Sequence, residues 1–270
     1  MTRRTPLYNR PTAYKKASIF VLNPSRLASL FISDTHIRNS EKMAEGSFPQ
    51  LQTIMKSLDG ESWSRLEPFR LPVLRSVHHT RINYPFLHTL AHFWDARKHV
   101  FRFGTVELCP LPEEFEALLG YNMDPTCQLA IPRLRSPPPH ATQQQLKTML
   151  DQPSQIPVSS IINSEIRLES LIGILLGIGT REVHWPRAMA LCLYSQFLLV
   201  SPSGNCDSKI LHVLDQVENG CNPFPLILAE TLVGLDNFAS SGRLSGSPML
   251  LEVSALSPYP YALCLSSTGA

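Results

Sequence analysis

The chain has 270 residues, of which 43% are hydrophobic and 17% charged, and its formal net charge is +2. It is long enough to bury a sizeable core, so a globular fold is expected over most of its length. No run of about 18 apolar residues occurs, which excludes a transmembrane helix from the expected elements. The charge is uneven, because residues 1–40 have a net charge of +6 and residues 188–270 a net charge of −4.

Residues 1–46 are predicted to form a flexible basic leader, because prolines interrupt any continuous helix. The first 33 residues lack acidic side chains and contain several serines, which is typical of an organelle transit peptide. The leader therefore has three interpretations: a solvated disordered segment, a transit peptide or a nuclear signal. Two basic pairs have roughly the spacing of a bipartite nuclear signal and are candidate contacts for phosphate groups or an import receptor: Arg3, Arg4, Lys15 and Lys16.

Three helices are expected in the first part of the globular region. Apolar residues recur at helical spacing over 48–58, and a shorter helix is expected over 63–69. Pro85 stands at the expected start of the third helix, where its missing N–H costs nothing. The apolar stripe of this helix is predicted to include Phe93 and Trp94.

Two alternating runs follow at 100–103 and 105–108, on either side of a turn glycine. They predict a small β-hairpin or ribbon near residues 99–108. Pro112 then starts a helix that Gly120 is expected to end. Acidic residues occupy its first turn, where they complement the helix dipole: Glu113, Glu114 and Glu116.

The second half alternates between proline-rich loops and helices. Residues 122–141 contain three consecutive prolines and predict an extended loop before a short helix over 142–150. The fold class is therefore mainly α, an irregular multi-helix domain with about eight helices and one small ribbon. Its later helices are expected over 164–178, over the strongly apolar 186–200, after a cap at Asp207, over 226–238 and from Ser247-Pro248 onward.

The six cysteines form no C-x-x-C pair, and no apolar secretory segment precedes them. Reduced thiols in the cytosol or nucleus are therefore expected. Cys192 is expected to fill the core, because it lies in the most apolar segment. The others are expected in loops or at helix ends: Cys109, Cys127, Cys206, Cys221 and Cys264.

His88 and His92 have the i and i+4 spacing that lets two zinc ligands share one face of a helix. Thr89 occupies the position where the metalloprotease motif requires a glutamate, so packing at the edge of the core is the favoured interpretation. The acidic turn after Pro112 offers carboxylates for acid–base catalysis, but the helix dipole explains it as well. The glycines of 173–179 lack the spacing of a dinucleotide site. Neither a P-loop nor a G-x-S-x-G elbow occurs, and no cofactor is predicted.

Residues 61–103 have a net charge of +4 and interleave basic with aromatic side chains. This pattern supports the alternative that the protein binds nucleic acid or an acidic protein surface. The aromatic residues of the pattern are Trp63, Phe69, Tyr84 and Trp94. The candidate basic contacts are Arg65, Arg70, Arg97, Lys98 and Arg102.

Two motifs, FLHTLAHFWD and HVFRFGTVELCPLPEEFEALLGY, resemble the signature of the plant mobile domain and of related transposon-derived plant families of unknown function. The matching residues are Leu87, Leu90, Trp94, Phe101, Phe103, Glu107, Glu113 or Glu114, Leu118, Leu119 and Gly120. Residues 214–236 and 243–256 are similar to downstream blocks of these families, although Ser254 replaces their usual tryptophan. Some relatives are labelled aminotransferase-like, but no lysine here has a recognisable Schiff-base setting.

The resemblance spans about 48–256 and implies a non-catalytic protein-interaction module that acts in nuclear gene regulation or genome maintenance. It also implies a nuclear protein partner, with a protein phosphatase as one candidate, and no membrane partner. The cytoplasm or an organelle is the alternative compartment, and an uncharacterised enzyme is a further alternative. The predicted organisation is a leader over 1–46, a plant mobile domain-like helical domain over 47–257 and a disordered or truncated tail over 258–270. Five residues are expected to form one packing nucleus: Trp94, Phe101, Phe103, Phe115 and Leu118.

Overall fold

The computed structural model describes residues 48–72, 74–77, 82–119, 127–132, 137–150 and 158–256. The described part is mainly helical and contains two small three-stranded antiparallel sheets. The predicted leader and tail, with Arg3, Arg4, Lys15, Lys16 and Cys264, lie outside these residues, as does Gly120.

The first half consists of short helices, as the apolar periodicity predicted. The helix expected over 63–69 is divided into an α-helix and a 3-10 turn, because the chain turns at Arg65 and Leu66. The helices of this half are α3 (Phe48–Ser57), α4 (Gly60–Ser64), η1 (Glu67–Phe69), α5 (Leu74–Val77), α6 (Tyr84–Ala91) and α7 (Pro112–Leu118).

The predicted hairpin is confirmed and has one additional strand. β2 (Val100–Phe103) pairs with β3 (Val106–Leu108) around Gly104, whose φ of 62° needs the freedom of glycine. β1 (Trp94–Asp95) pairs with the other edge of β2. The prediction that Phe93 and Trp94 continue the helical stripe is therefore wrong. The Phe93 carbonyl instead accepts the N–H of Arg102 in β2 at 2.8 Å, so strand pairing replaces the last helical turn.

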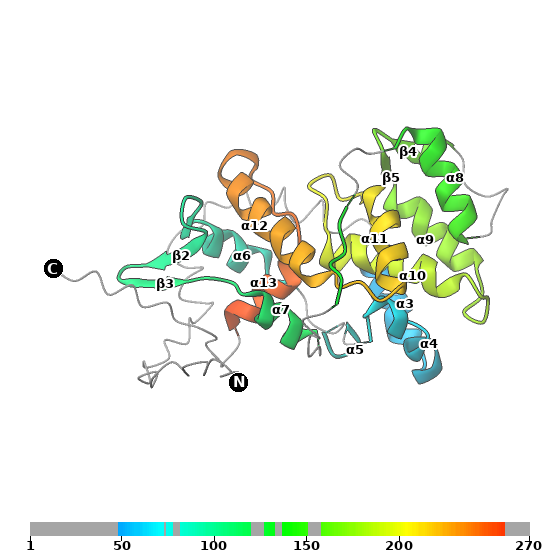
Figure 1. Ribbon diagram of the computed structural model, residues 1–270, viewed down its shortest axis with the longest axis horizontal. Coiled ribbons are helices and arrows are strands. Elements are labelled where there is room, and N and C mark those ends of the chain that lie inside the picture. Colours follow the sequence, from blue (N-terminus) through cyan, green and yellow to red (C-terminus); the bar gives the residue numbers. More distant parts are fainter. Residues whose placement is uncertain are drawn as a thin grey trace, which may run out of the picture.

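The second half is also mainly helical, with one unexpected sheet. Its elements are α8 (Pro139–Leu150), η2 (Val158–Ser160), β4 (Ile161–Ile162), β5 (Glu165–Ile166), α9 (Leu168–Gly177), α10 (Trp185–Leu193), the π-helix η3 (Tyr194–Leu198), β6 (Cys206–Asp207), α11 (Lys209–Glu218), α12 (Phe224–Ser241) and α13 (Pro248–Leu256). Figure 1 shows that α8 to α11 gather toward one end of an elongated molecule and that the β2–β3 ribbon lies toward the other, near α6 and α12.

Several boundaries in this half differ from the sequence prediction, and three of the differences are instructive. The helix expected from residue 164 begins at Leu168, because β4 and β5 form a hairpin through Asn163 and Ser164. The helix expected from residue 142 begins at Pro139, where proline is compatible with a first helical turn. Asp207 is a strand residue rather than a cap, although its carboxylate accepts the N–H of Lys209 at 2.9 Å.

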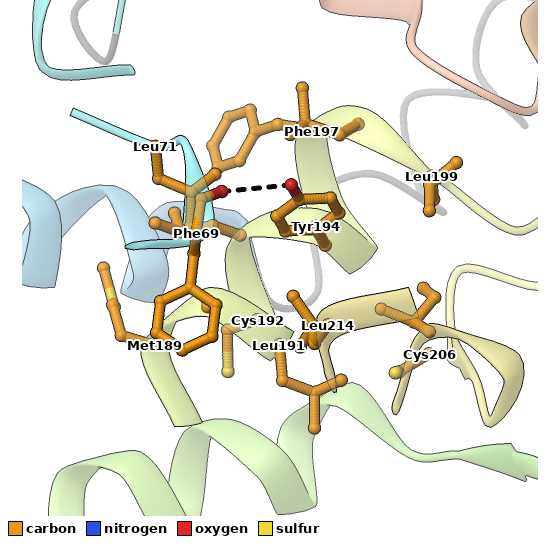
Figure 2. Close-up of a cluster of buried hydrophobic side chains, with 14 of the residues drawn as sticks. Phe69, Leu71, Met189, Leu191, Cys192, Tyr194, Phe197, Leu199, Cys206 and Leu214 are labelled. Atoms are coloured by element: carbon orange, nitrogen blue, oxygen red, sulfur yellow. Dashed lines mark hydrogen bonds between the residues drawn. The ribbon is translucent and has the colours of Figure 1, made fainter. Parts of the chain in front are cut away.

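Two hydrophobic clusters form the core. The main cluster surrounds α10 and η3, where the buried Tyr194 hydroxyl donates to the Phe69 carbonyl at 3.0 Å (Figure 2). The smaller cluster joins α6, β2, α12 and α13. Ile82 packs against both clusters and so connects them.

The predicted packing nucleus is divided between these clusters. Phe101 is buried in the smaller cluster and Phe115 in the main one, and Leu118 packs against the main one from a half-buried position. Trp94 and Phe103 are also half-buried, at the margin of the smaller cluster. The nucleus therefore does not exist as a single unit, because α7 and the ribbon contact different parts of the core.

Cys192 is buried in the main cluster, as predicted, but Cys206 is buried there too. Figure 2 shows both sulfur atoms among the side chains of this cluster. The expectation of a loop or helix-end position for Cys206 was wrong, because β6 brings it into the core through its pairing with Ile166.

Candidate functional site

The structure distributes the predicted basic contacts over separate elements. Arg65 lies beside α10, where its guanidinium donates to the backbone carbonyls of Thr180 and Glu182 and lies over the Trp185 ring, 6.0 Å from its centroid. These hydrogen bonds of the Arg65 guanidinium therefore hold the 178–184 loop in place. Arg70 has a left-handed φ of 63° at the end of η1.

The ribbon brings together Arg97, Lys98 and Arg102, but it also brings acids to them. Lys98 Nζ lies 3.0 Å from Glu107 Oε1, and Arg102 contacts both Asp95 at 3.2 Å and Glu107 at 3.4 Å. Lys98 and Arg102 are about half exposed, so each pair contributes little to stability. The pairs nevertheless neutralise much of the positive charge that the sequence predicted for this surface.

Three of the four aromatic residues of the predicted nucleic-acid pattern are not free to stack on bases. Trp63 and Phe69 are buried in the main cluster. Trp94 donates its Nε1–H to Asp236 Oδ1 at 2.8 Å and is in ring contact with Phe101. The expected interleaving of cations and exposed rings is therefore lost on folding.

His88 and His92 both make edge contacts with the Phe238 ring, at centroid distances of 5.0 and 5.7 Å. This places the two imidazoles at the margin of the smaller cluster, as the favoured interpretation expected. In the part of the chain that the structure describes, no group of three or more His, Cys, Asp or Glu side chains has an arrangement that could hold a metal ion.

The predicted first-turn acids Glu114 and Glu116 are not solvated. Both are only 7% exposed, so dipole complementarity alone does not explain them. Glu114 Oε2 accepts the N–H of Leu111 at 3.2 Å and the hydroxyl of Ser254 at 3.1 Å, which ties α7 to α13. Ser254, where the resembling families have tryptophan, thus has a polar partner in this chain.

A further buried carboxyl group lies on α13. Glu252 Oε2 accepts the backbone N–H of Asn83 at 2.9 Å and so fixes the start of α6. Burial raises the pKa of Glu252, and this outweighs the opposing effect of the Asn83 hydrogen bond. Burial also raises the pKa of the nearby Tyr84 hydroxyl, with a smaller contribution from Glu252. Glu252 thus connects two helices, and it lies outside the lining of the two open grooves described next.

The first open groove, with a volume of about 770 Å³, lies between α8, α10 and α11. We call it the amide groove, because three consecutive glutamines of α8 line it together with His140, Thr148, Met149, Arg187, Leu211 and Asp215. Met149 and Leu211 supply an apolar floor, and the other named side chains are polar. Glutamine side chains both donate and accept, so this surface can pair with a peptide backbone.

The second groove, of about 760 Å³, lies between the α4–η1 region and the start of α10. Its lining includes Phe69, Val183, His184, Pro186, Arg187 and Glu218. Val183 is 78% exposed at this groove, a large exposure for an apolar side chain. We call it the proline groove, after Pro68 and Pro186 in its lining.

Arg187 lines both grooves, so the two grooves lie next to each other. Its guanidinium forms a bidentate pair with Glu218, with contacts of 2.8 and 3.3 Å. Both partners are about one-third exposed, so this pair remains accessible from solvent. The linings of the two grooves together contain charged, amide and apolar groups.

Sequence reasoning missed these residues. Arg187 belongs to a helix that was predicted only as a buried core element, and the glutamines of α8 carry no motif. The available signal was the run of three glutamines at 143–145, which marks a polar helix face but does not reveal what lies opposite.

The chain matches no protein-family model, no curated protein and no solved structure. The resemblance to the plant mobile domain therefore stays a prediction. Within the described residues, none of the helices combines the length and apolar character needed to cross a bilayer.

Proposed function

We propose that the chain is a non-catalytic protein-interaction module that binds an extended segment of a partner protein along the neighbouring amide and proline grooves. The observation that carries this proposal is that one residue, Arg187, lines both grooves and so makes them neighbours. An extended peptide needs a long, shallow surface with an apolar floor and scattered hydrogen-bonding groups, and these grooves have that composition.

The molecule itself contains an example of the proposed recognition. Gln216 of α11 holds an extended stretch of this chain with its side-chain amide. Its Oε1 accepts the N–H of Ile131 at 3.0 Å, and its Nε2 donates to the carbonyl of the same residue at 2.8 Å. Gln144 and Gln145 of the amide groove can pair with a partner's backbone in the same way.

The resemblance to transposon-derived plant families extends this proposal to the cell. We place the module in the nucleus, where its partner would be a protein of gene regulation or genome maintenance, such as a protein phosphatase. This assignment rests on the sequence motifs around the ribbon and α7.

A pull-down from plant nuclear extract tests the groove directly with two matched variants. Thr148→Arg puts a long side chain into the amide groove from an exposed position on α8. Thr53→Arg makes the same change on α3, outside the lining of both grooves. The two variants are well matched, because both threonine hydroxyls donate a 2.9 Å hydrogen bond to the carbonyl four residues earlier, in exposed settings.

Proteins captured by the wild type and by Thr53→Arg, but lost with Thr148→Arg, are the expected result. Equal capture by all three proteins would contradict binding in the amide groove. Thermal unfolding of both variants checks that neither loses its fold.

A further inference from the structure

Residues 127–132 form an extended segment that we call the strap. It crosses the turn between α11 and α12 and is attached there by backbone hydrogen bonds. The N–H of Asn222 donates to the Gln128 carbonyl at 2.7 Å, and the N–H of Ala130 donates to the Asn222 carbonyl at 2.8 Å. Ala130 is buried against the main cluster, so the strap is packed as well as hydrogen-bonded.

Two cysteines lie where the strap meets this turn. Cys127 Sγ donates to the Gly220 carbonyl at 2.9 Å, and Cys221 follows directly. The Gly220 carbonyl and the Cys221 N–H belong to one planar peptide unit. The Cys127 sulfur is therefore in contact with the peptide unit that leads into Cys221.

The backbone pairing leads to the same conclusion. Leu129 pairs in parallel with Asn222, so Cys127 is level with Gly220 and is staggered by one residue from Cys221. Adjacent strands lie about 4.8 Å apart and one residue advances about 3.3 Å, which gives an α-carbon separation of roughly 6 Å. Disulfides span α-carbon separations of about 4.4–6.8 Å.

Regular strands would direct two staggered side chains to opposite faces, but this turn is not regular. Gly220 has a left-handed φ of 91°, so the chain changes direction immediately before Cys221. The Cys221 side chain packs against the main cluster, which also contains the buried strap residue Ala130. Cys221 therefore lies beside the strap, and the Cys127 sulfur lies at the peptide unit that precedes it.

The other close pair of cysteines differs in accessibility. Cys192 and Cys206 are fully buried, and burial raises the pKa of Cys206 to about 12 and that of Cys192 well above its usual range. Because the thiolate is the species that reacts, this pair is protected from exchange with soluble disulfides. Cys127 and Cys221 are both partly exposed.

We infer that Cys127 and Cys221 form a reversible disulfide that fastens the strap to the α11–α12 turn when a small-molecule disulfide is present. One protein thiolate attacks the small disulfide, which breaks its S–S bond, forms a mixed disulfide and releases one thiolate. The second protein thiolate then attacks the protein sulfur of the mixed disulfide and releases the second small thiolate. The two protein thiols lose two protons and two electrons, and the small disulfide gains them.

Oxidation of the full chain with glutathione disulfide, followed by peptide mass mapping without reduction, tests the inference. The wild type should yield one cross-linked peptide pair that contains Cys127 and Cys221. Cys109→Ser and Cys264→Ser are the controls and should give the same pair. Cys127→Ser and Cys221→Ser should not give it.

The melting temperature provides a second measurement, because a bond between positions far apart in sequence restricts the unfolded chain. Oxidised wild type should melt at a higher temperature than reduced wild type, and Cys127→Ser should show no such rise. A mixed disulfide that persists on Cys127, a link from Cys127 to any other cysteine, or no change on oxidation would each overturn the inference.

Discussion

Gly246 lies at a close backbone contact between α12 and the segment that leads into α13. Its φ is 79°, in the left-handed region, and its N–H and carbonyl both pair with Val200, at 3.0 and 2.7 Å. A β-carbon at this position would lie 2.6 Å from Thr231 Oγ1 and still closer to the main chain of that residue. The backbone is held on both sides, so it cannot move away to relieve the contact.

Gly246→Ala therefore combines two costs. A left-handed conformation costs an L-residue about 1–2 kcal/mol, and overpacking against a fixed neighbour adds about 1–3 kcal/mol. The free energy of unfolding should fall by roughly 2–5 kcal/mol. Gly242→Ala is the matched control, because Gly242 also has a left-handed φ, of 65°, but a β-carbon there would meet no atom within 4 Å. This control should lose only the conformational part.

Urea unfolding followed by circular dichroism measures both variants, since the midpoint and the slope together give the free energy. The reasoning requires a clearly larger loss for Gly246→Ala than for Gly242→Ala. Equal losses would mean that the close approach to Thr231 does not exist in solution.

Three further changes test other parts of the fold. Trp94→Phe removes the indole N–H that Asp236 accepts and should lower the free energy of unfolding by about 1–2 kcal/mol, measured by urea unfolding; an unchanged midpoint would exclude this bond. Gly173→Ala lies in the middle of α9 with open space around it and should raise the melting temperature, because it stabilises the helix by about 0.5–1 kcal/mol; a lower melting temperature would contradict the open surroundings. Glu252→Gln tests the buried carboxyl group. Burial raises its folded-state pKa above the ordinary 4.5, so the stabilisation from its neutral form is complete below that pH and is lost as pH rises through the folded-state pKa. The variant keeps an acceptor for Asn83, so its stability relative to wild type should increase from about pH 4 to pH 7 in a urea series; a constant difference would contradict the assignment.

Local patterns predicted the parts of the fold that local interactions determine. The apolar period of α3 and the turn glycine between β2 and β3 needed no distant partner to be recognised. The β4–β5 hairpin also had a local sequence signal, the asparagine at its turn. Asn163 and Ser164 have left-handed φ values of 50° and 66°, and asparagine tolerates this conformation better than most residues. The helical spacing of later apolar residues obscured that signal.

Trp94 could not have been placed from the sequence. Its helical spacing from Leu87 and Leu90 is real, but the chain turns after Ala91 to pair with a strand that comes later. Its polar partner, Asp236, lies 142 positions away in α12. Tertiary contacts of this kind override a periodic pattern, because they provide hydrogen-bond partners both for the indole N–H and for the backbone at the edge of β2.

The grooves were unpredictable for a similar reason. The amide groove requires α8, α10 and α11 to meet, and no feature of one helix indicates the others. In the sequence, nothing distinguishes Arg187 from an ordinary charged residue on a helix. Only the fold places it beside two grooves, with Glu218 as its ion-pair partner.

The positive charge of residues 61–103 shows how folding changes the meaning of a sequence pattern. The net charge of a segment predicts a positively charged binding surface only when no acidic side chains from other segments lie beside it in the fold. Here Glu107 lies 3.0 Å from Lys98, and Asp236 lies 3.2 Å from His99, although both acids come from outside that segment. Arg65 meanwhile donates to backbone carbonyls rather than to solvent. A partner would therefore meet nearly balanced charge on the ribbon, so shape and hydrogen bonding at the grooves, rather than net positive charge, are the more selective basis for recognition.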